Sequence, residues 1–198
     1  MLAPVGQGYN HSQPMGRRHD QIMPELTAWI ERQRVFFVAT APLAADGLVN
    51  CSPKGLDTLR ILTPRVVAYL DLTGSGIETV AHVRENGRVA LMFCAFDGPP
   101  RILRLHGRGS VLTFGDAGFA DLLARFPELP GVRSIIRVDV QRIADSCGFG
   151  VPQYEFVGER DQLAKWTAAK GDAALADYRK AKNAVSIDGL PGLKPPFG

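Results

Sequence analysis

Two short polar segments of this 198-residue chain could bind an anion or take part in chemistry. The first is the turn Leu72-Thr73-Gly74-Ser75-Gly76, whose hydroxyls and glycines precede a predicted short helix. The first backbone N–H groups of a helix have no partner within it, so such a turn can hold a phosphate. The second is Asn50-Cys51-Ser52-Pro53-Lys54-Gly55, where a proline and a glycine restrict the backbone on both sides of a lysine. Together they predict a site for a phosphate-bearing cofactor on a β-sheet scaffold.

Each of these polar groups also has a purely structural interpretation. Ser75 or Thr73 could cap the helix that follows the turn. Glu78 near the helix start would complement the helix dipole and counts against a bound anion. Lys54 could be an ordinary solvated lysine in a turn.

A third group alternates along one predicted strand. Arg104, His106 and Arg108 are two residues apart, so their side chains share one face of that strand. A row of cations is unusual for a core, and we expect this face to meet solvent, a cleft or a partner subunit. His106, or His82 on the short helix, could ligate haem; a hydrogen-bonded structural role is the competing interpretation of both.

The composition excludes several classes of function. Hydrophobic and charged fractions of 45% and 22% are those of a soluble globular protein. The net charge of +3 is spread along the chain, which argues against nucleic acid, and no apolar run is long enough for a membrane span. The chain shows no nucleophile–base set, dinucleotide fingerprint or metal-ligand spacing. Three cysteines indicate reduced thiols in the core of a cytoplasmic protein.

The elements that must position these residues are mostly strands. Hydrophobic patterns predict four helical segments, the last one a single helix or a helix pair around Gly171. They also predict six strands, of which the nearly apolar fourth should be covered on both faces. The strands are expected at residues 35–44, 48–55, 65–71, 88–96, 102–114 and 134–140, and the helices at 22–34, 78–85, 115–126 and 159–182. Short strands joined by hairpins favour a mainly β fold, an antiparallel barrel with flanking helices. Gly107 and Gly109 should allow a bulge or a close approach.

The chain divides into three parts on this interpretation. Residues 1–20 are expected to be a flexible N-terminal segment, and residues 21–145 the barrel domain. Residues 146–198 form a helical extension and tail that pack on the barrel or a partner subunit. The breakers after residue 184 predict an extended or mobile tail.

The succession FFVATAP, VNCSPKG, VAYLDLTGSG, AHVRENGRVALMF and ILRLHGRG resembles the pyridoxamine 5′-phosphate oxidase-related, FMN-binding split-barrel family. The resemblance implies a six-stranded antiparallel split β-barrel and a homodimer with FMN in the cleft between subunits. It also implies a flavin-dependent oxidoreductase acting on a small-molecule substrate. A deazaflavin (F420)-dependent reductase and a haem-binding protein are alternatives with the same fold.

The resemblance also implies which residues surround the cofactor. Along the flavin ring or ribityl chain we expect Ser52, Pro53, Lys54 and Gly55, with Asp71 and Thr73 beside the cofactor. Around the phosphate we expect Ser75, Gly76 and Thr79. Further contacts are expected from Arg104 and from Trp166, which would reach the flavin of the other subunit.

One departure from the family pattern concerns charge. Members that act on pyridoxamine phosphate carry an Arg-Lys pair where this chain reads Gly76-Ile77-Glu78-Thr79. The loss of two charge-assisted contacts costs roughly 1.5–3 kcal/mol each. Compensating cations are expected among Lys54, Arg84, Arg104 and Arg108.

Overall fold

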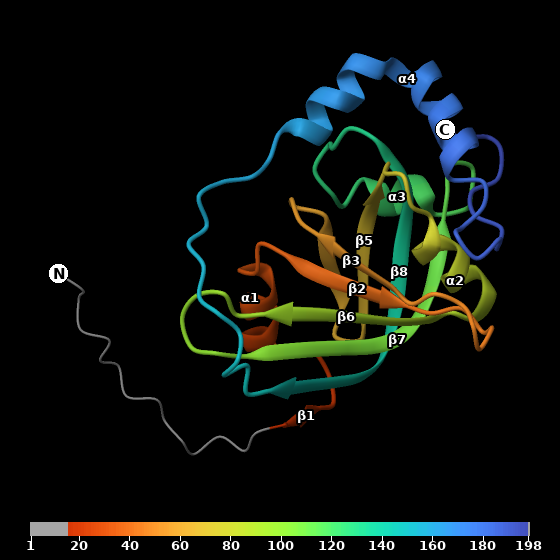
Figure 1. The fold of residues 1–198 in the computed structure, drawn as a ribbon. Coiled ribbons are helices and arrows are strands. Elements are labelled where there is room, and N and C mark those ends of the chain that lie inside the picture. Colours follow the sequence, from red (N-terminus) through yellow and green to blue (C-terminus); the bar gives the residue numbers. More distant parts are fainter. Residues whose placement is uncertain (1–15, 198) are drawn as a thin grey trace.

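The structure, a computed structural model, describes residues 16–197 and is built on one antiparallel sheet of eight strands (Figure 1). The strands are β1 (Arg18–His19), β2 (Phe36–Thr40), β3 (Asn50–Lys54), β4 (Leu59–Thr63), β5 (Val66–Leu72), β6 (Arg88–Cys94), β7 (Ile102–Leu112) and β8 (Val132–Ser146). The helices are α1 (Pro24–Glu31), α2 (Glu78–Asn86), α3 (Phe119–Leu123) and α4 (Gln162–Lys182). All six predicted strands are present, and the mainly β, antiparallel fold class is confirmed.

The order of the strands shows why the sheet is curled. Neighbours follow the path β3-β2-β6-β7-β8-β5-β4, so β3 and β4 are its two edges. These edges are consecutive in the chain and are joined only by residues 55–58. A connection of that length spans less than about 20 Å, so the sheet must roll until its edges face each other. The result is a barrel with a split between β3 and β4.

Two strands were not expected. β4 lies at the edge of the split, and β1 pairs with β8 through Arg18↔Ala144 and His19↔Ile143. β1 belongs to the segment of residues 1–20 predicted to be flexible, and residues 1–15 of that segment lie outside the described part. β1 has two residues, too few to show an alternating pattern, whereas β4 is a five-residue strand in a segment for which no strand was predicted.

The core fills the barrel interior. Alternate residues of the strands point inward, among them Val38, Leu91 and Leu105, which are fully buried. Leu26 and Ile30 of α1 close the barrel on one side, and α2 packs against β2 and β7. A second apolar cluster around Phe126 and Ile135 lies beneath α3.

The predicted bulge in β7 is present. The register with β8 shifts between His106 and Gly107, and a Cβ at Gly107 would lie 2.3 Å from the carbonyl oxygen of Asp139. Only glycine allows this approach of two strands, which lets the sheet turn sharply at this point.

The C-terminal part is more ordered than the sequence predicts. Helix α4 is kinked at Gly171, which decides for the second of the two expected alternatives, a helix pair around this glycine. After it the chain packs against α2, with Leu193 buried in the core, so the expectation of an extended or mobile tail is wrong. Leu193 donates its N–H to the carbonyl of Asn183, and a Cβ at Gly192 would lie 2.9 Å from Ile77. The proline and glycine residues after residue 184 therefore belong to a C-terminal segment that packs on the protein, and not to a free tail. No helix in residues 16–197 has the length and apolar character needed to cross a membrane.

Candidate functional site

The candidate site lies at the split between the two edges of the sheet. Lys54 is the last residue of β3, and Asp71 lies near the end of β5. The ammonium nitrogen of Lys54 is 3.1 Å from Oδ1 of Asp71, so an ion pair bridges the split. Arg133 and Ser134, at the start of β8, reach Oδ2 of Asp71 at 2.8 and 3.1 Å. Four side chains from three strands therefore meet at one carboxylate.

Asp71 is ionised although it is fully buried. Burial alone would raise the pKa of this carboxyl, but the positive charges of Arg133 and Lys54, with their hydrogen bonds, lower the pKa to about 2. Two cations face one anion, which leaves a local charge of +1. Only Lys54 reaches water, with 20% of its side chain exposed against 5% for Arg133. The free positive charge of the cluster is therefore presented at Lys54.

A strip of polar side chains continues from Lys54 along β3. The pleat places Asn50, Ser52 and Lys54 on the same face of this strand. Ser52 donates to the side-chain carbonyl of Asn50 at 2.8 Å, and the Asn50 amide donates to Thr79 of α2 at 3.0 Å. The structure thus brings Ser52, Lys54, Asp71 and Thr79 to one side of the split; their contact with a cofactor stays a prediction.

The turn before α2 is held by its carbonyl groups. The carbonyl oxygen of Gly74 accepts hydrogen bonds from Arg133 at 3.1 Å and from Asn183 at 2.9 Å. Because the C=O and N–H of a trans peptide point in opposite directions, the N–H of Ser75 faces away from these partners. Within the described residues, the N–H groups of Ser75 and Gly76 have no acceptor. Both residues are exposed, so two free donors lie at the start of the helix, as an anion site requires.

The alternative interpretation of the hydroxyls as helix caps is wrong. The residue before the first turn of α2 is Ile77, and it has no side-chain cap. Thr73 is buried, donates its hydroxyl proton to Gly131 at 2.7 Å and accepts from Arg179 at 3.0 Å. Thr73 therefore fixes the turn from behind and does not face a ligand.

Glu78 competes with an anion at this position. Its carboxylate oxygen lies 2.4 Å from the point where a Cβ of Gly76 would stand. Its other oxygen accepts the N–H of Ile187 at 3.3 Å, and this contact is exposed. A carboxylate near the N-terminus of α2 is favourable for the helix dipole. A bound phosphate would have to displace it.

Most of the cations expected to compensate for the missing Arg-Lys pair lie elsewhere. Arg84 donates to the carbonyl of Gly192, Arg104 to the hydroxyl of Ser146 and Arg108 to the carbonyl of Asn86. Only Lys54 is in place. The sequence reasoning missed Arg133 and Arg179, which lie directly behind the turn. Nothing in their local sequence marks them, because they reach the turn only through strand pairing and the packing of α4.

Pro53 and Arg104 lie on the outer face of the barrel. The register aligns Pro53 of β3, Phe37 of β2, Met92 of β6 and Arg104 of β7 in one row across four strands. Phe37, Met92 and Arg104 are half-buried, and Pro53 is exposed. The expectation that β6 is covered on both faces is therefore wrong within this chain, since its outer side chains remain accessible.

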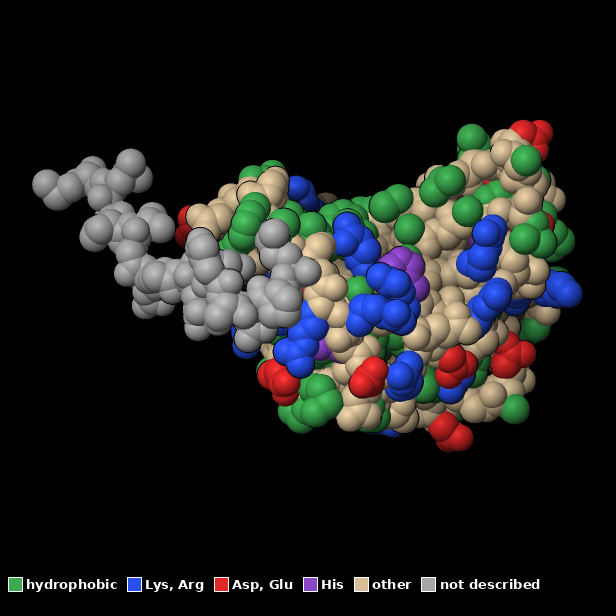
Figure 2. Space-filling view, turned by 90° about the horizontal axis from the view of Figure 1, so that it is seen from below, with side chains coloured by type: hydrophobic (Ala, Val, Ile, Leu, Met, Phe, Trp, Pro, Cys, Tyr) green, Lys and Arg blue, Asp and Glu red, His purple; other side chains and the backbone are tan. Residues whose placement is uncertain are grey.

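His106 occupies the same outer face. Its ring is exposed, and Arg142 of β8 lies opposite it. Burial, and then the charges of Arg142 and Arg104, lower the pKa of His106, so the imidazole is neutral near pH 7. In Figure 2 a histidine lies near the middle of one face of the molecule, with several Lys and Arg side chains around it. The expectation that this row meets solvent or a cleft holds within the single chain.

His82 and the cysteines differ from one another in burial. His82 is fully buried, with Nδ1 3.0 Å from the hydroxyl of Thr40, which supports the structural interpretation.

Cys94 is buried as predicted, but Cys51 is exposed and Cys147 is partly exposed, so the prediction of three core thiols is wrong for Cys51. Cys51 has its outward position because it alternates with the inward-facing Asn50 and Ser52.

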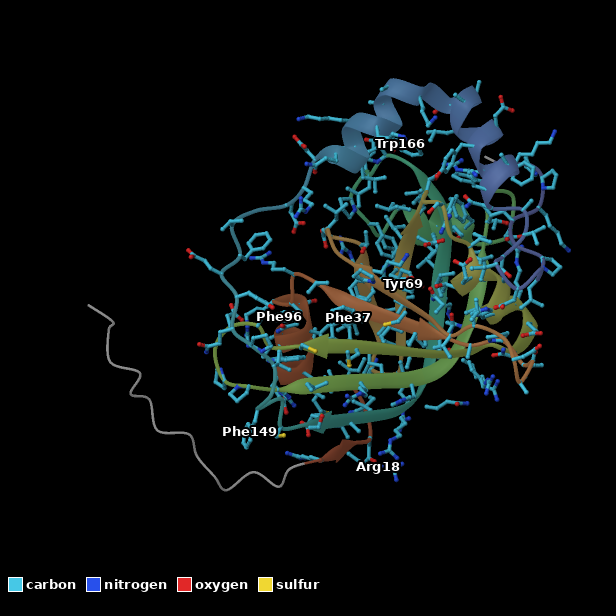
Figure 3. All side chains as sticks on the ribbon, in the orientation of Figure 1. Arg18, Phe37, Tyr69, Phe96, Phe149 and Trp166 are labelled. Carbon is cyan, nitrogen blue, oxygen red and sulfur yellow. The ribbon has the colours of Figure 1, made fainter. Side chains whose placement is uncertain are left out.

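Two remaining predicted residues have local roles in this chain. The carbonyl of Gly55 accepts the hydroxyl of Thr58 at 2.8 Å and shapes the β3–β4 connection. Trp166 packs edge-to-face on Tyr178 across the kink of α4, with ring centroids 5.1 Å apart. Figure 3 shows Trp166 on α4, well separated from Tyr69 on the strand that carries Asp71. Its contact with a partner's cofactor stays a prediction.

Comparison with known proteins identifies the relatives of this chain. Residues 22–147 match the family model described as pyridoxamine 5′-phosphate oxidase. The pyridoxamine 5′-phosphate oxidase family protein ustO of Aspergillus flavus is 38% identical over 194 residues, covering 88% of this chain and 77% of that protein. A solved structure from Lactobacillus delbrueckii, provisionally named a pyridoxamine 5′-phosphate oxidase, is 19% identical with a TM-score of 0.50, covers 66% of this chain and 98% of its own, and shares the split-barrel fold. The chain thus belongs to the pyridoxamine 5′-phosphate oxidase family.

Proposed function

We propose that this protein is a flavin-dependent oxidoreductase that binds FMN at the split of the barrel. The observation that carries the proposal is the Lys54–Asp71 pair, which holds an ammonium group in place beside a turn with free N–H donors. A flavin mononucleotide needs both features, because it carries a phosphate at one end and gathers negative charge on its ring when reduced. Family membership supports the same assignment.

The residues of the site fit this cofactor. The N–H groups of Ser75 and Gly76 would receive the phosphate once the Glu78 carboxylate moves aside. Lys54 and Ser52 would lie along the ring and the ribityl chain. The flavin supplies hydride transfer at its N5 atom when bound.

The side chains of the site would then orient the flavin and stabilise its reduced form. Lys54 would place a positive charge near the ring, which becomes negative on reduction, and Asp71 fixes the ammonium in its position. Arg133 keeps Asp71 ionised and paired from the interior. No side chain is assigned as acid or base in the reaction.

The proposed assembly is a homodimer through the outer face of β2, β3, β6 and β7. Phe37 and Met92 leave apolar surface half-exposed there, next to Arg104 and Pro53. Contiguous apolar surface of this kind often marks a protein interface. Light scattering after gel filtration should give twice the chain mass, and Phe37→Glu should give monomers. Val185→Glu, at a residue 55% exposed on the tail, serves as the matched control. A wild-type monomer overturns this assembly.

Titration with FMN tests the cofactor. The wild type should quench FMN fluorescence and show flavin absorption, whereas Lys54→Met should weaken binding about 10-fold or more. Lys165→Met is the matched control, because Lys165 forms an exposed ion pair with Asp161 on α4. Failure of the wild type to bind FMN overturns the proposal. Parallel titrations with F420 and haemin decide between the alternatives.

Haem binding is the second candidate because of His106. An exposed neutral imidazole between Arg104 and Arg142 offers an iron ligand next to cations for the propionates. Haem binding would be supported by a Soret band of the protein–haemin mixture that disappears in His106→Ala. If the spectrum of haemin is the same with and without the protein, haem binding is excluded.

A further inference from the structure

A cavity lies between α4 and the segment that precedes β8, and Lys54 is not among the residues that line it. Its volume is about 720 Å³. Figure 1 shows α4 arching over this end of the barrel, above α3 and the connection to β8. Most of the lining is apolar; its hydrophobic side chains include Phe114, Leu123, Phe126, Leu129, Val132 and Leu175. Cavities of this size with a mostly apolar wall and a few polar groups are the usual form of small-molecule sites.

Arg179 is a buried cation without a counterion in this wall. Only 3% of the residue is exposed, and within residues 16–197 no carboxylate lies within 4.0 Å of its guanidinium. It donates to Thr73, to the carbonyl of Val132 at 3.1 Å and to the carbonyl of Phe197 at 2.7 Å, all neutral acceptors. A guanidinium has five N–H donors, so two have no acceptor among the described residues. Burial of an unpaired charge is costly, which makes this position suited to an anion.

Thr167 is a second unsatisfied group in the same wall. The residue is 5% exposed, and its buried hydroxyl has no hydrogen-bond partner. The hydroxyl oxygen lies 3.1 Å from the position where a Cβ of Gly131 would stand, so Thr167 packs closely against this glycine. A ligand oxygen is the kind of partner that this hydroxyl lacks.

The negative groups of the cavity are at its mouth. Asp172 and Glu128 line it but are exposed to solvent, in contrast to Arg179, Thr167 and Leu175. Burial, followed by the charge of Arg133, lowers the pKa of Arg179, and Asp172 opposes this only weakly. The cavity is therefore positive at its buried end and acidic at its rim.

We propose that this cavity binds a small organic monocarboxylate, with its carboxylate at Arg179 and Thr167 and its aliphatic or aromatic body against Phe126 and Leu175. The charge of the ligand would pair the buried guanidinium, and its apolar part would cover the hydrophobic wall. This site differs from the proposed flavin site at Lys54, although Arg179 also donates to Thr73 of the turn at residues 72–76.

Calorimetric titration with octanoate tests the proposal, with octanamide as the uncharged analogue of the same shape. Octanoate should bind, and octanamide should bind about 10- to 100-fold more weakly, because the amide cannot neutralise Arg179. Trp166, adjacent to Thr167, gives a second readout by its fluorescence. Equal affinity for the two compounds, or no octanoate binding, overturns the proposal.

Variants assign the binding to this cavity. Thr167→Val should weaken octanoate binding several-fold without loss of folding, whereas Thr27→Val on α1 should leave it unchanged. Arg179→Gln should abolish the preference for octanoate over octanamide. If that variant does not fold, Arg179→Lys serves instead and should retain the preference at reduced affinity. Lys54→Met should not affect octanoate; a loss of octanoate binding in this variant would place the ligand in the flavin site and overturn the proposal.

Discussion

The ammonium of Lys54 lies 3.1 Å from the carboxylate of Asp71 and joins the two sides of the barrel where the sheet is open. β3 and β4 make no backbone ladder with each other, so side chains must hold the split. Asp71 is completely buried, and it receives Arg133 and Ser134 on its other oxygen. The same contact therefore supports the fold and fixes a cation at the proposed cofactor site.

Replacement of Asp71 by asparagine should strongly destabilise the protein. Arg133 would remain buried without its partner, and the loss of one member of a buried ion pair costs about 3–5 kcal/mol. Urea denaturation measures the free energy of unfolding. Asp57→Asn is the control, because Asp57 is 68% exposed where it pairs with Arg60, and its loss should cost less than about 1 kcal/mol. Equal effects of the two variants would contradict the role assigned to Asp71.

Acid should remove the contribution of Asp71 in a defined range of pH. The pKa of its carboxyl is about 2 in the folded protein and 3.8 for the unperturbed group, so the folded state binds the proton less tightly. The resulting stability, roughly 2 kcal/mol, is fully present above pH 3.8 and is lost as the pH falls towards 2. Urea midpoints measured between pH 5 and pH 2 should fall for the wild type. The difference between wild type and Asp71→Asn should shrink over the same range; a constant difference would refute the assignment.

Gly107→Ala should disrupt the bulge between β7 and β8. The new methyl group would lie 2.3 Å from the carbonyl oxygen of Asp139, and neither backbone can move without breaking ladder hydrogen bonds. We expect a loss of about 1–3 kcal/mol of unfolding free energy. Gly150→Ala, where a Cβ meets nothing within 4 Å, should stay within about 0.5 kcal/mol of the wild type. Chemical denaturation of both variants checks this, and a neutral Gly107→Ala would show that the close approach is absent.

The C-terminal segment after α4 should contribute to stability through Leu193. This side chain is 6% exposed and belongs to the barrel core, so Leu193→Ala should cost about 2–5 kcal/mol. Ile187→Ala, in the same segment but 70% exposed, should have little effect. Thermal unfolding of the two variants separates a packed tail from a free one. If both variants melt with the wild type, the tail does not pack as described.

The local pattern of the sequence determined much of the scaffold. Alternating and apolar runs identified six of the eight strands, because the period of side chains along a strand is a local property. Gly107 and Gly171 were interpretable for the same reason, since a glycine in a regular element marks a bulge or a break. The turn at residues 72–76 before a helix also followed from the sequence, whereas the split beside Lys54 was implied by the family resemblance.

Only the tertiary structure decided which charges meet at that turn. Arg133 is 62 residues from Asp71, and Arg179 is 106 residues from Thr73. Their contacts depend on the register of β5 with β8 and on the packing of α4 over the barrel, which no local pattern specifies. The short strands β1 and β4 and the buried Leu193 likewise gain their stability from distant partners. The sequence by itself thus determined six of the strands and the two polar segments around residues 50–55 and 72–76, because these are local patterns. Tertiary packing decided where the barrel opens and which polar groups are paired, buried or free to bind, because these depend on distant partners.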